Sequence, residues 1–131
     1  MKKLWKLKIT PYKSGKIAEL LCRMYMRLLG YSIIAKNHIT GSGKKTFCGE
    51  IDFIAKKKNK IIFCEVKKRK NKNEIFRALS PKQQKRIING AMSFIKNNKK
   101  YRNCIIQFDV FFVILPFKIK RIKNAFRCDN I

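Results

Sequence analysis

Two short apolar segments separated by a basic turn constrain the fold of this chain more than any other feature. Residues 47–56 and 61–67 are rich in β-branched and aromatic side chains, and the turn sequence Lys57-Lys58-Asn59-Lys60 lies between them. This pattern is typical of antiparallel strands joined by a tight turn. The sequence therefore predicts a central β-hairpin. A chain of 131 residues is the size of one domain.

Helices are predicted on both sides of the hairpin. Residues 14–29 are apolar around most of the helix circumference, so we expect a well-buried helix with Ser14 as its N-cap. Residues 1–13 would then form a basic N-terminal arm. A second helix is expected to begin at Ser80-Pro81 and to run to about Lys96. Its buried face would consist of Ile87, Ile88, Ala91, Met92 and Ile95.

Further strands are predicted at residues 31–39 and 104–115, and a last short element of unassigned type is expected at 119–126. The second of these strands is apolar on both faces, so it should lie inside the sheet, and Pro116 should end it. Residues 40–46 contain two glycines and two lysines and are expected to form a loop.

Basic residues far outnumber acidic ones. The chain has 33 Lys and Arg against 7 Asp and Glu, a net charge of +26. An AT-rich coding sequence would enrich lysine, but it would enrich acids as well, so coding bias does not explain the excess. A surface this positive favours nucleic acid through counterion release. An anionic membrane is the weaker alternative, because no basic amphipathic helix with an aromatic face stands out.

The cysteine and histidine content disfavours a soft-metal site. The five cysteines are scattered, and most sit among apolar neighbours as small core residues would. His38 is the only histidine, which disfavours a histidine-based metal site. Lys6 and Lys8 interrupt any signal-peptide core at the N-terminus. We therefore expect a reducing, cytoplasmic location.

Three of the seven acids lie in the predicted hairpin. With a symmetric turn, Asp52 lies opposite Glu65, and Glu50 lies opposite Lys67, all on one face. The other face would carry the apolar residues Ile51, Phe53, Ala55, Ile62, Cys64 and Val66.

A cross-strand salt bridge would account for Glu50 and Lys67 but not for Asp52 facing Glu65. Two ionised carboxylates ~5 Å apart repel by about 3 kcal/mol at an effective dielectric constant of 20. A shared proton, a nearby lysine or a divalent cation would relieve this repulsion. We favour a cation, and carboxylate oxygens select Mg²⁺ or Mn²⁺ over zinc. Such an ion polarises a phosphoryl oxygen, and Lys67 would orient water or stabilise negative charge.

The same residues resemble a known family. Gly49 to Ala55 reads GEIDFIA and Phe63 to Arg69 reads FCEVKKR, similar to the GEIDLIA and FVEVKxR motifs of the YraN-like proteins. These are small bacterial proteins with the PD-(D/E)xK restriction-endonuclease-like fold, related to archaeal Holliday-junction resolvases. The similarity extends over roughly residues 15–126.

This resemblance implies one endonuclease-like α/β domain, with a mixed central sheet flanked by helices. It implies that Asp52, Glu65 and the backbone carbonyl of Val66 hold the metal, and that Lys67 is the catalytic lysine. Glu19 would be an additional acid from the first helix. From the sequence alone, an i,i+4 pair with Arg23 on an exposed stripe explains Glu19 equally well. We count Glu50 with the catalytic acids because it shares their face.

The expected nucleic-acid contacts are Lys44, Lys45, Lys68, Arg69, Lys82 and Gln84. Two positions depart from the family pattern. Gln83-Gln84 stands where a Lys-Gln pair is usual, with Lys82 one position early, and Gln107 replaces a usual arginine. Both changes would be expected to weaken phosphate contacts or activity.

The leading hypothesis is a Mg²⁺- or Mn²⁺-dependent endonuclease acting on branched or damaged DNA. One alternative is a non-catalytic DNA- or RNA-binding module that retains the fold. Another is an RNA- or ribosome-associated basic protein whose acids are structural. By analogy with resolvases, a homodimer would engage two strands.

Overall fold

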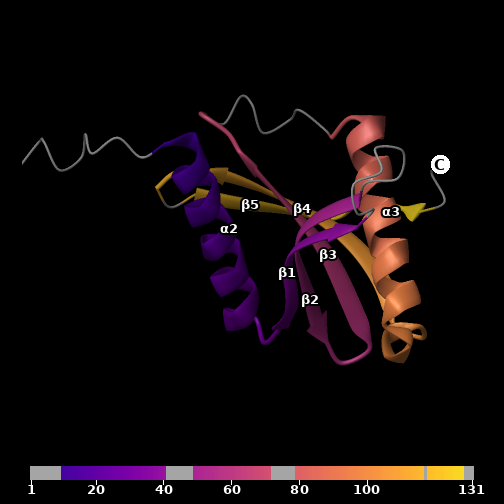
Figure 1. Ribbon diagram of the computed structural model, residues 1–131. Helices are drawn as coiled ribbons and strands as arrows, with labels where there is room; N and C mark the ends of the chain where they lie inside the picture. The colour runs from indigo at the N-terminus through magenta and orange to yellow at the C-terminus, as the bar shows by residue number, and fades with distance from the viewer. Residues whose placement is uncertain (1–9, 41–48, 72–78, 117, 129–131) are drawn as a thin grey trace, which may run out of the picture.

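The computed structural model describes residues 10–40, 49–71, 79–116 and 118–128. Within these ranges a single β-sheet separates two helices that lie on opposite sides of it (Figure 1). Residues 41–46 of the predicted loop, including Lys44 and Lys45, lie outside the described residues, as do residues 1–9 of the predicted arm.

The sheet has the strand order β1-β2-β3-β4-β5. The strands are β1 (Ser32–Thr40), β2 (Gly49–Lys57), β3 (Lys60–Lys68), β4 (Ile105–Ile114) and β5 (Lys118–Phe126). Only the β3–β4 pairing is parallel. A parallel return requires a crossover, which helix α3 (Pro81–Asn97) and a short 3₁₀ turn (Lys99–Tyr101) provide. With helix α2 (Pro11–Leu28) on the other face, the predicted mixed α/β architecture is confirmed.

The hairpin has the predicted register. Phe53 pairs with Cys64 and Ile54 with Phe63, and Lys58 turns the chain with a φ of 53°. The pairing recorded between β2 and β3 ends at Phe53 and Cys64. Beyond that point Asp52 Oδ2 accepts the Val66 N–H at 2.7 Å. The strands therefore diverge just where the acidic residues begin.

Strict alternation of the two faces of β2 also ends there. Phe53 and Ala55 pack under α2, as predicted. Ile51 instead packs with Ile54 on the α3 side. It lies 3.2 Å from where a Cβ at Gly90 would be. The prediction that Ile51 shares a face with Phe53 is wrong, because β2 is no longer held flat against β3 at that point.

Helix α2 begins earlier than the sequence prediction. Thr10 is the N-cap, its Oγ1 accepting the Lys13 N–H at 3.2 Å, and Pro11 opens the first turn. Residues 11–13 are thus helical rather than part of an arm. Ser14 is buried, and its hydroxyl donates to the Pro11 carbonyl at 3.1 Å. This helix start, Thr10-Pro11, is of the same kind as Ser80-Pro81, from which the start of α3 was predicted correctly.

Helix α2 is less buried than expected. Ala18, Cys22 and Met26 are buried against the sheet. Four apolar side chains on its outer side stay exposed: Ile17 at 38%, Leu20 at 44%, Met24 at 49% and Leu28 at 87%. Nothing in the described part of the chain covers this side. The prediction that α2 is well buried is therefore wrong for its outer side.

Helix α3 agrees closely with the prediction. Ser80 and Gln83 form a capping box, and the helix ends at Asn97. Ile87, Ala91 and Phe94 form the middle of the buried face. Met92 lies at its edge and is 41% exposed, so its predicted burial is wrong.

The prediction of an interior strand is confirmed by β4, and the last short element is strand β5. β4 lies between β3 and β5, and the residues from Gln107 to Val113 are buried.

The cysteines Cys22, Cys64, Cys104 and Cys128 are free thiols, buried or half-buried. Within the described ranges, no helix combines the length and the apolar character needed to cross a membrane.

Candidate functional site

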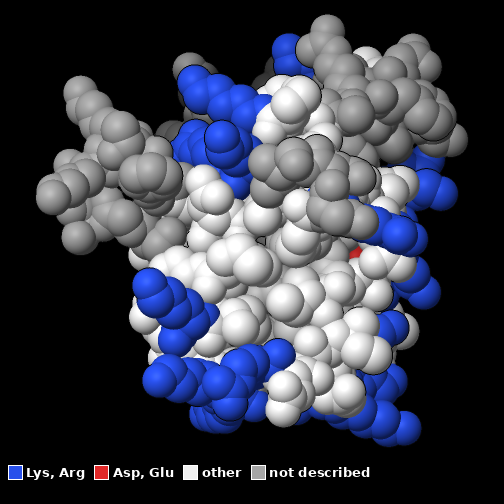
Figure 2. Space-filling view, turned by 90° about the vertical axis from the view of Figure 1, so that its right-hand side faces the viewer, with Lys and Arg blue, Asp and Glu red and all other residues white. Residues whose placement is uncertain are grey.

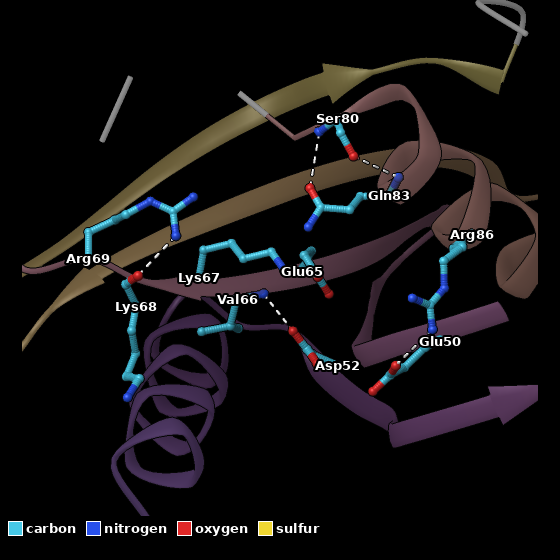
Figure 3. A network of polar contacts seen from close by, with 10 residues as sticks. All are labelled: Glu50, Asp52, Glu65, Val66, Lys67, Lys68, Arg69, Ser80, Gln83 and Arg86. Atoms are coloured by element: carbon cyan, nitrogen blue, oxygen red, sulfur yellow. Dashed lines mark hydrogen bonds and ion pairs between the residues drawn. The ribbon is translucent and has the colours of Figure 1, made fainter. Parts of the chain in front are cut away.

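A cavity of about 190 Å³ opens where β2 and β3 diverge, beside the first turns of α3. It brings together all four polar residues that the hairpin register predicted to share a face. The lining residues are Glu50, Asp52, Glu65, Val66, Lys67, Gln83, Arg86 and Ile87. Figure 3 shows Glu65 and Lys67 beside Asp52 on the hairpin, Arg86 of α3 pointing to Glu50, and Gln83 turned back to Ser80.

Asp52 and Glu65 lie close enough for their carboxyl groups to share a hydrogen bond. Burial, and then the charge of Glu65 and that hydrogen bond, raise the pKa of Asp52 to about 8. The hydrogen bond from the Val66 N–H and the charge of Lys67 act in the opposite direction but do not cancel the effect. Near neutral pH the two carboxyl groups therefore retain a proton between them.

The lysine and the second acid are paired differently from the prediction. Lys67 Nζ lies 3.0 Å from Glu65 Oε2, an ion pair within one strand. Glu50 is paired instead with Arg86 of α3, at 3.6 Å between Oε2 and Nη2. The predicted Glu50–Lys67 salt bridge is wrong, because the ladder that would set these residues opposite each other stops at Phe53 and Cys64.

Glu19 approaches this group from α2. Its side chain is only 16% exposed, and Lys16 lies 3.9 Å away. Burial and then the charge of Asp52 raise the pKa of Glu19. Its Oε1 atom is buried without a hydrogen-bond partner. Glu19 therefore does not lie on an exposed stripe. The charges of Lys16 and Arg23 lower its pKa but do not cancel the effect of burial and of Asp52, and Glu19 does not line the cavity.

The predicted nucleic-acid contacts differ in how they are used. Lys68 Nζ bonds the Ser14 hydroxyl and, at 3.3 Å, the Pro11 carbonyl, so it connects β3 to the start of α2. Arg69 lies over the Phe112 ring at 5.1 Å. Lys82 is exposed in the first turn of α3. Gln84 donates to the Leu79 carbonyl at 3.0 Å.

Gln83 and Arg86 are cavity residues that the sequence interpretation did not assign to the site. They are three positions apart, and Ile87 beside them is buried, so one helix face presents both to the hairpin. That spacing after the Ser80-Pro81 start was the available signal. Gln83 also explains its own departure from the family pattern, because its Oε1 accepts the Ser80 N–H at 3.0 Å.

Gln107, the other departure, lies away from the cavity. Its side-chain amide donates to Asp109 Oδ1 at 2.8 Å, and the Asn124 N–H donates to the same oxygen at 3.1 Å. Arg121 Nε lies 2.8 Å from Asp109 Oδ2. Gln107 therefore belongs to a buried structural network and does not line the cavity.

The donor set suits a hard divalent cation. Mg²⁺ typically takes one or two protein carboxylates and keeps several waters. Asp52 and Glu65 supply two carboxylates in contact, and Asp52 lies near enough to Glu19 for its charge to raise the pKa of Glu19. In the described ranges no group of three or more His, Cys, Asp or Glu side chains is close enough to form a cage of protein ligands alone. The residues thus fit a partly hydrated ion.

The surface around α3 is basic and poor in acids. Figure 2 shows the side on which α3 lies, with Lys and Arg side chains spread around an uncharged middle and almost no acidic surface visible. Among the described residues, Glu50, Asp52 and Glu65 line the cavity and Asp109 is buried in the interior.

Comparison with known proteins agrees with the motifs. The sequence profile of the Uncharacterised protein family UPF0102 matches residues 18–113. A UPF0102 protein of Clostridium beijerinckii is 38% identical over 120 residues, covering 86% of this chain and 92% of the relative. One from Paramagnetospirillum magneticum is 34% identical over 118 residues, covering 89% of each chain. The chain belongs to the UPF0102, or YraN-like, family.

Proposed function

We propose that this protein is a Mg²⁺- or Mn²⁺-dependent endonuclease that hydrolyses phosphodiester bonds in nucleic acid. The observation that carries the proposal is the contact between Asp52 and Glu65 in a cavity that also holds Lys67. Two acids are rarely brought together at a cost in repulsion unless a function requires them. DNA with branches or damage is the substrate that the family resemblance favours.

Asp52 and Glu65 would hold the metal ion in this proposal. When bound, such an ion polarises a phosphoryl oxygen and lowers the pKa of a coordinated water. The Val66 N–H fixes one oxygen of Asp52, so the other is directed by a rigid strand rather than by a free rotamer. Glu19 adds negative potential from α2, which would strengthen cation binding.

Lys67 would act on the phosphate. Its Nζ atom lies 3.0 Å from Glu65 Oε2, and this ion pair would hold the side chain oriented within the cavity. A positive group at this place would stabilise the negative charge that develops on the phosphoryl oxygens. The net charge of +26 would draw the nucleic-acid backbone to the cavity.

Cleavage of labelled DNA tests the proposal. Wild-type protein should nick a four-way junction or a gapped duplex with Mg²⁺ or Mn²⁺, and EDTA should stop the reaction. Asp52→Asn and Lys67→Ala should reduce the rate by at least about 10²-fold. Lys85→Ala, which removes one exposed charge from α3 outside the cavity, is the matched control and should retain most activity.

Equal trace cleavage by wild type and Asp52→Asn, purified identically, would mean contamination and would contradict the proposal. A non-catalytic nucleic-acid-binding module is the second candidate. It is favoured by the ion pairs Glu65–Lys67 and Glu50–Arg86, which leave the cavity largely self-neutralised without an added ion. In that case Asp52→Asn and Lys67→Ala would leave binding unchanged, whereas neutralising Arg69 or Lys82 would weaken it and flatten its salt dependence.

A further inference from the structure

We propose that Arg86 forms a second phosphate-binding subsite on the α3 side of the cavity, and that Glu50 occupies it until nucleic acid binds. The inference rests on the proposed function for its ligand, a phosphodiester chain. It adds a residue and a competition between Glu50 and phosphate that the nuclease motif does not contain.

Arg86 shares the cavity with the candidate metal ligands but comes from a different element. It lies on α3, whereas Asp52, Glu65 and Lys67 belong to the hairpin. In Figure 3 the Glu50–Arg86 pair and the Glu65–Lys67 pair flank Asp52 on different sides. A nucleic-acid strand that bound at Asp52 with one phosphate near Lys67 would therefore place a neighbouring phosphate near Arg86.

The contact between Glu50 and Arg86 is well suited to exchange. Its 3.6 Å separation is long, and the two side chains are 56% and 50% exposed. Exposed ion pairs of this kind contribute little, because water solvates both partners and salt screens them. A phosphate offers the guanidinium two parallel hydrogen bonds, which Glu50 at this distance does not form.

The backbone under the pair is fixed more firmly than the pair itself. A Cβ at Gly90 would lie 3.3 Å from the Glu50 backbone N and 3.2 Å from Ile51, so α3 seats directly against β2 there. Ile87, next to Arg86, is buried in the core beneath the helix. The guanidinium can leave Glu50 while its helix stays in place, which is what a prepositioned phosphate ligand requires.

Gln83 also lines the cavity, but it does not supply a positive charge for a phosphate. Its side-chain oxygen is used by the Ser80 N–H in the capping box, so only its neutral amide group remains for a ligand. Arg86, one turn later, is therefore the cation that α3 contributes to the lining of the cavity.

A double-mutant cycle on binding tests the inference without any cleavage. Wild type, Arg86→Ala, Glu50→Gln and the double variant are titrated against a fluorescein-labelled four-way DNA junction in EDTA, with fluorescence anisotropy as the readout. Lys85→Ala is the control for loss of one positive charge from α3. Arg86→Ala should weaken binding about 5- to 10-fold, clearly more than Lys85→Ala, and should lower the salt slope by about one.

Glu50→Gln should tighten binding about 3-fold in the wild-type background and much less in the Arg86→Ala background, because its effect acts through Arg86. Arg86→Lys should bind with intermediate affinity, since it keeps the charge but loses the planar fork. It also serves if Arg86→Ala misfolds. Equal losses for Arg86→Ala and Lys85→Ala, or an equal gain from Glu50→Gln in both backgrounds, would overturn the inference.

The outcome is separable from that of the nuclease proposal. A non-additive cycle in a protein that never cleaves would support the subsite and remove the hydrolytic function. An additive cycle in a protein that does cleave would remove the subsite alone.

Discussion

Asp52 and Asp109 are both strand aspartates shielded from solvent, yet their surroundings are opposite. The Asp109 side chain is fully buried and satisfied by Arg121, Gln107 and the Asn124 N–H. Asp52 faces another carboxyl group, and its pKa is raised to about 8. Burial of an acid therefore does not identify a functional site. The proposed function rests instead on the second carboxyl group that faces Asp52.

The groups around Asp109 and Asp52 also lie at different places in the sheet and are expected to affect stability in opposite directions. The Asp109 network joins β4 to β5 at an irregularity in their pairing, where Asn124 has a φ of 51°. It stabilises the fold. The Asp52 group lies where β2 and β3 separate, and we expect it to weaken the metal-free fold as rising pH removes the proton held by the acid pair.

The largest expected effect is the loss of the Asp109 charge. Asp109→Asn would leave Arg121, whose side chain is 7% exposed, as a buried cation without a counter-ion. We expect the free energy of unfolding to fall by ~3–5 kcal/mol in urea denaturation. Asp109→Asn/Arg121→Met, which removes both charges, should recover most of it. A loss below ~1 kcal/mol for the single variant would contradict the comparison.

Asp52→Asn should have the opposite sign. Because the folded-state pKa of Asp52 lies above its unfolded value, the unfolded chain releases the proton first as pH rises. Wild-type stability should thus decline between about pH 4 and pH 8, and the full penalty applies above that range. In EDTA at pH 9, Asp52→Asn should be more stable than wild type by ~1–3 kcal/mol, less than the whole pKa shift because the acid pair relaxes.

Urea denaturation of both proteins at pH 5 and pH 9 measures this difference. An asparagine can still accept the Val66 N–H, so the variant keeps the local backbone bond. Parallel stability curves for wild type and variant at both pH values would show that the carboxyl pair does not oppose folding.

Metal binding should sharpen the same contrast. At ten times its dissociation constant, Mn²⁺ should raise wild-type stability by ~1.4 kcal/mol and leave Asp52→Asn nearly unchanged. Binding near pH 7 should release protons, because the ion displaces the proton held by the acid pair. Calorimetry in buffers of different ionisation enthalpy measures that release. Equal stabilisation of the variant would place the ion elsewhere.

The smallest effect is expected at Gln107. Gln107→Ala removes one hydrogen bond from Asp109 but leaves the Arg121 pair, so stability should fall by ~0.5–1.5 kcal/mol. Cleavage measured well below the unfolding temperature should not change, because Gln107 does not line the cavity. A large change in rate without a change in stability would connect the two networks.

The hairpin was the most predictable part of the molecule. Side chains alternate with a period of two, and a symmetric turn fixes the register, so Phe53–Cys64 and Ile54–Phe63 follow from the sequence. Both helices begin with a hydroxyl residue followed by proline, but the start was predicted correctly only for α3.

The partners of the acids were not predictable in the same way. Whether Glu50 meets Lys67 or Arg86 depends on where the ladder ends and how α3 crosses the sheet. Both are long-range consequences of packing that no local pattern encodes. The exposure of Leu28 and of the other apolar side chains on the outer side of α2 also depends on long-range packing. An apolar helix face shows only that its burial would be favourable.

The parallel pairing of β3 with β4 affects the order in which the sheet can assemble during synthesis. β3 is an interior strand, and one of its two neighbours is not translated until after the crossover helix. A nascent chain ending in α3 would expose one whole backbone edge of the strand that carries Glu65 and Lys67. We therefore expect β3 to gain its second neighbour in the sheet only after residues 105–114 have been synthesised.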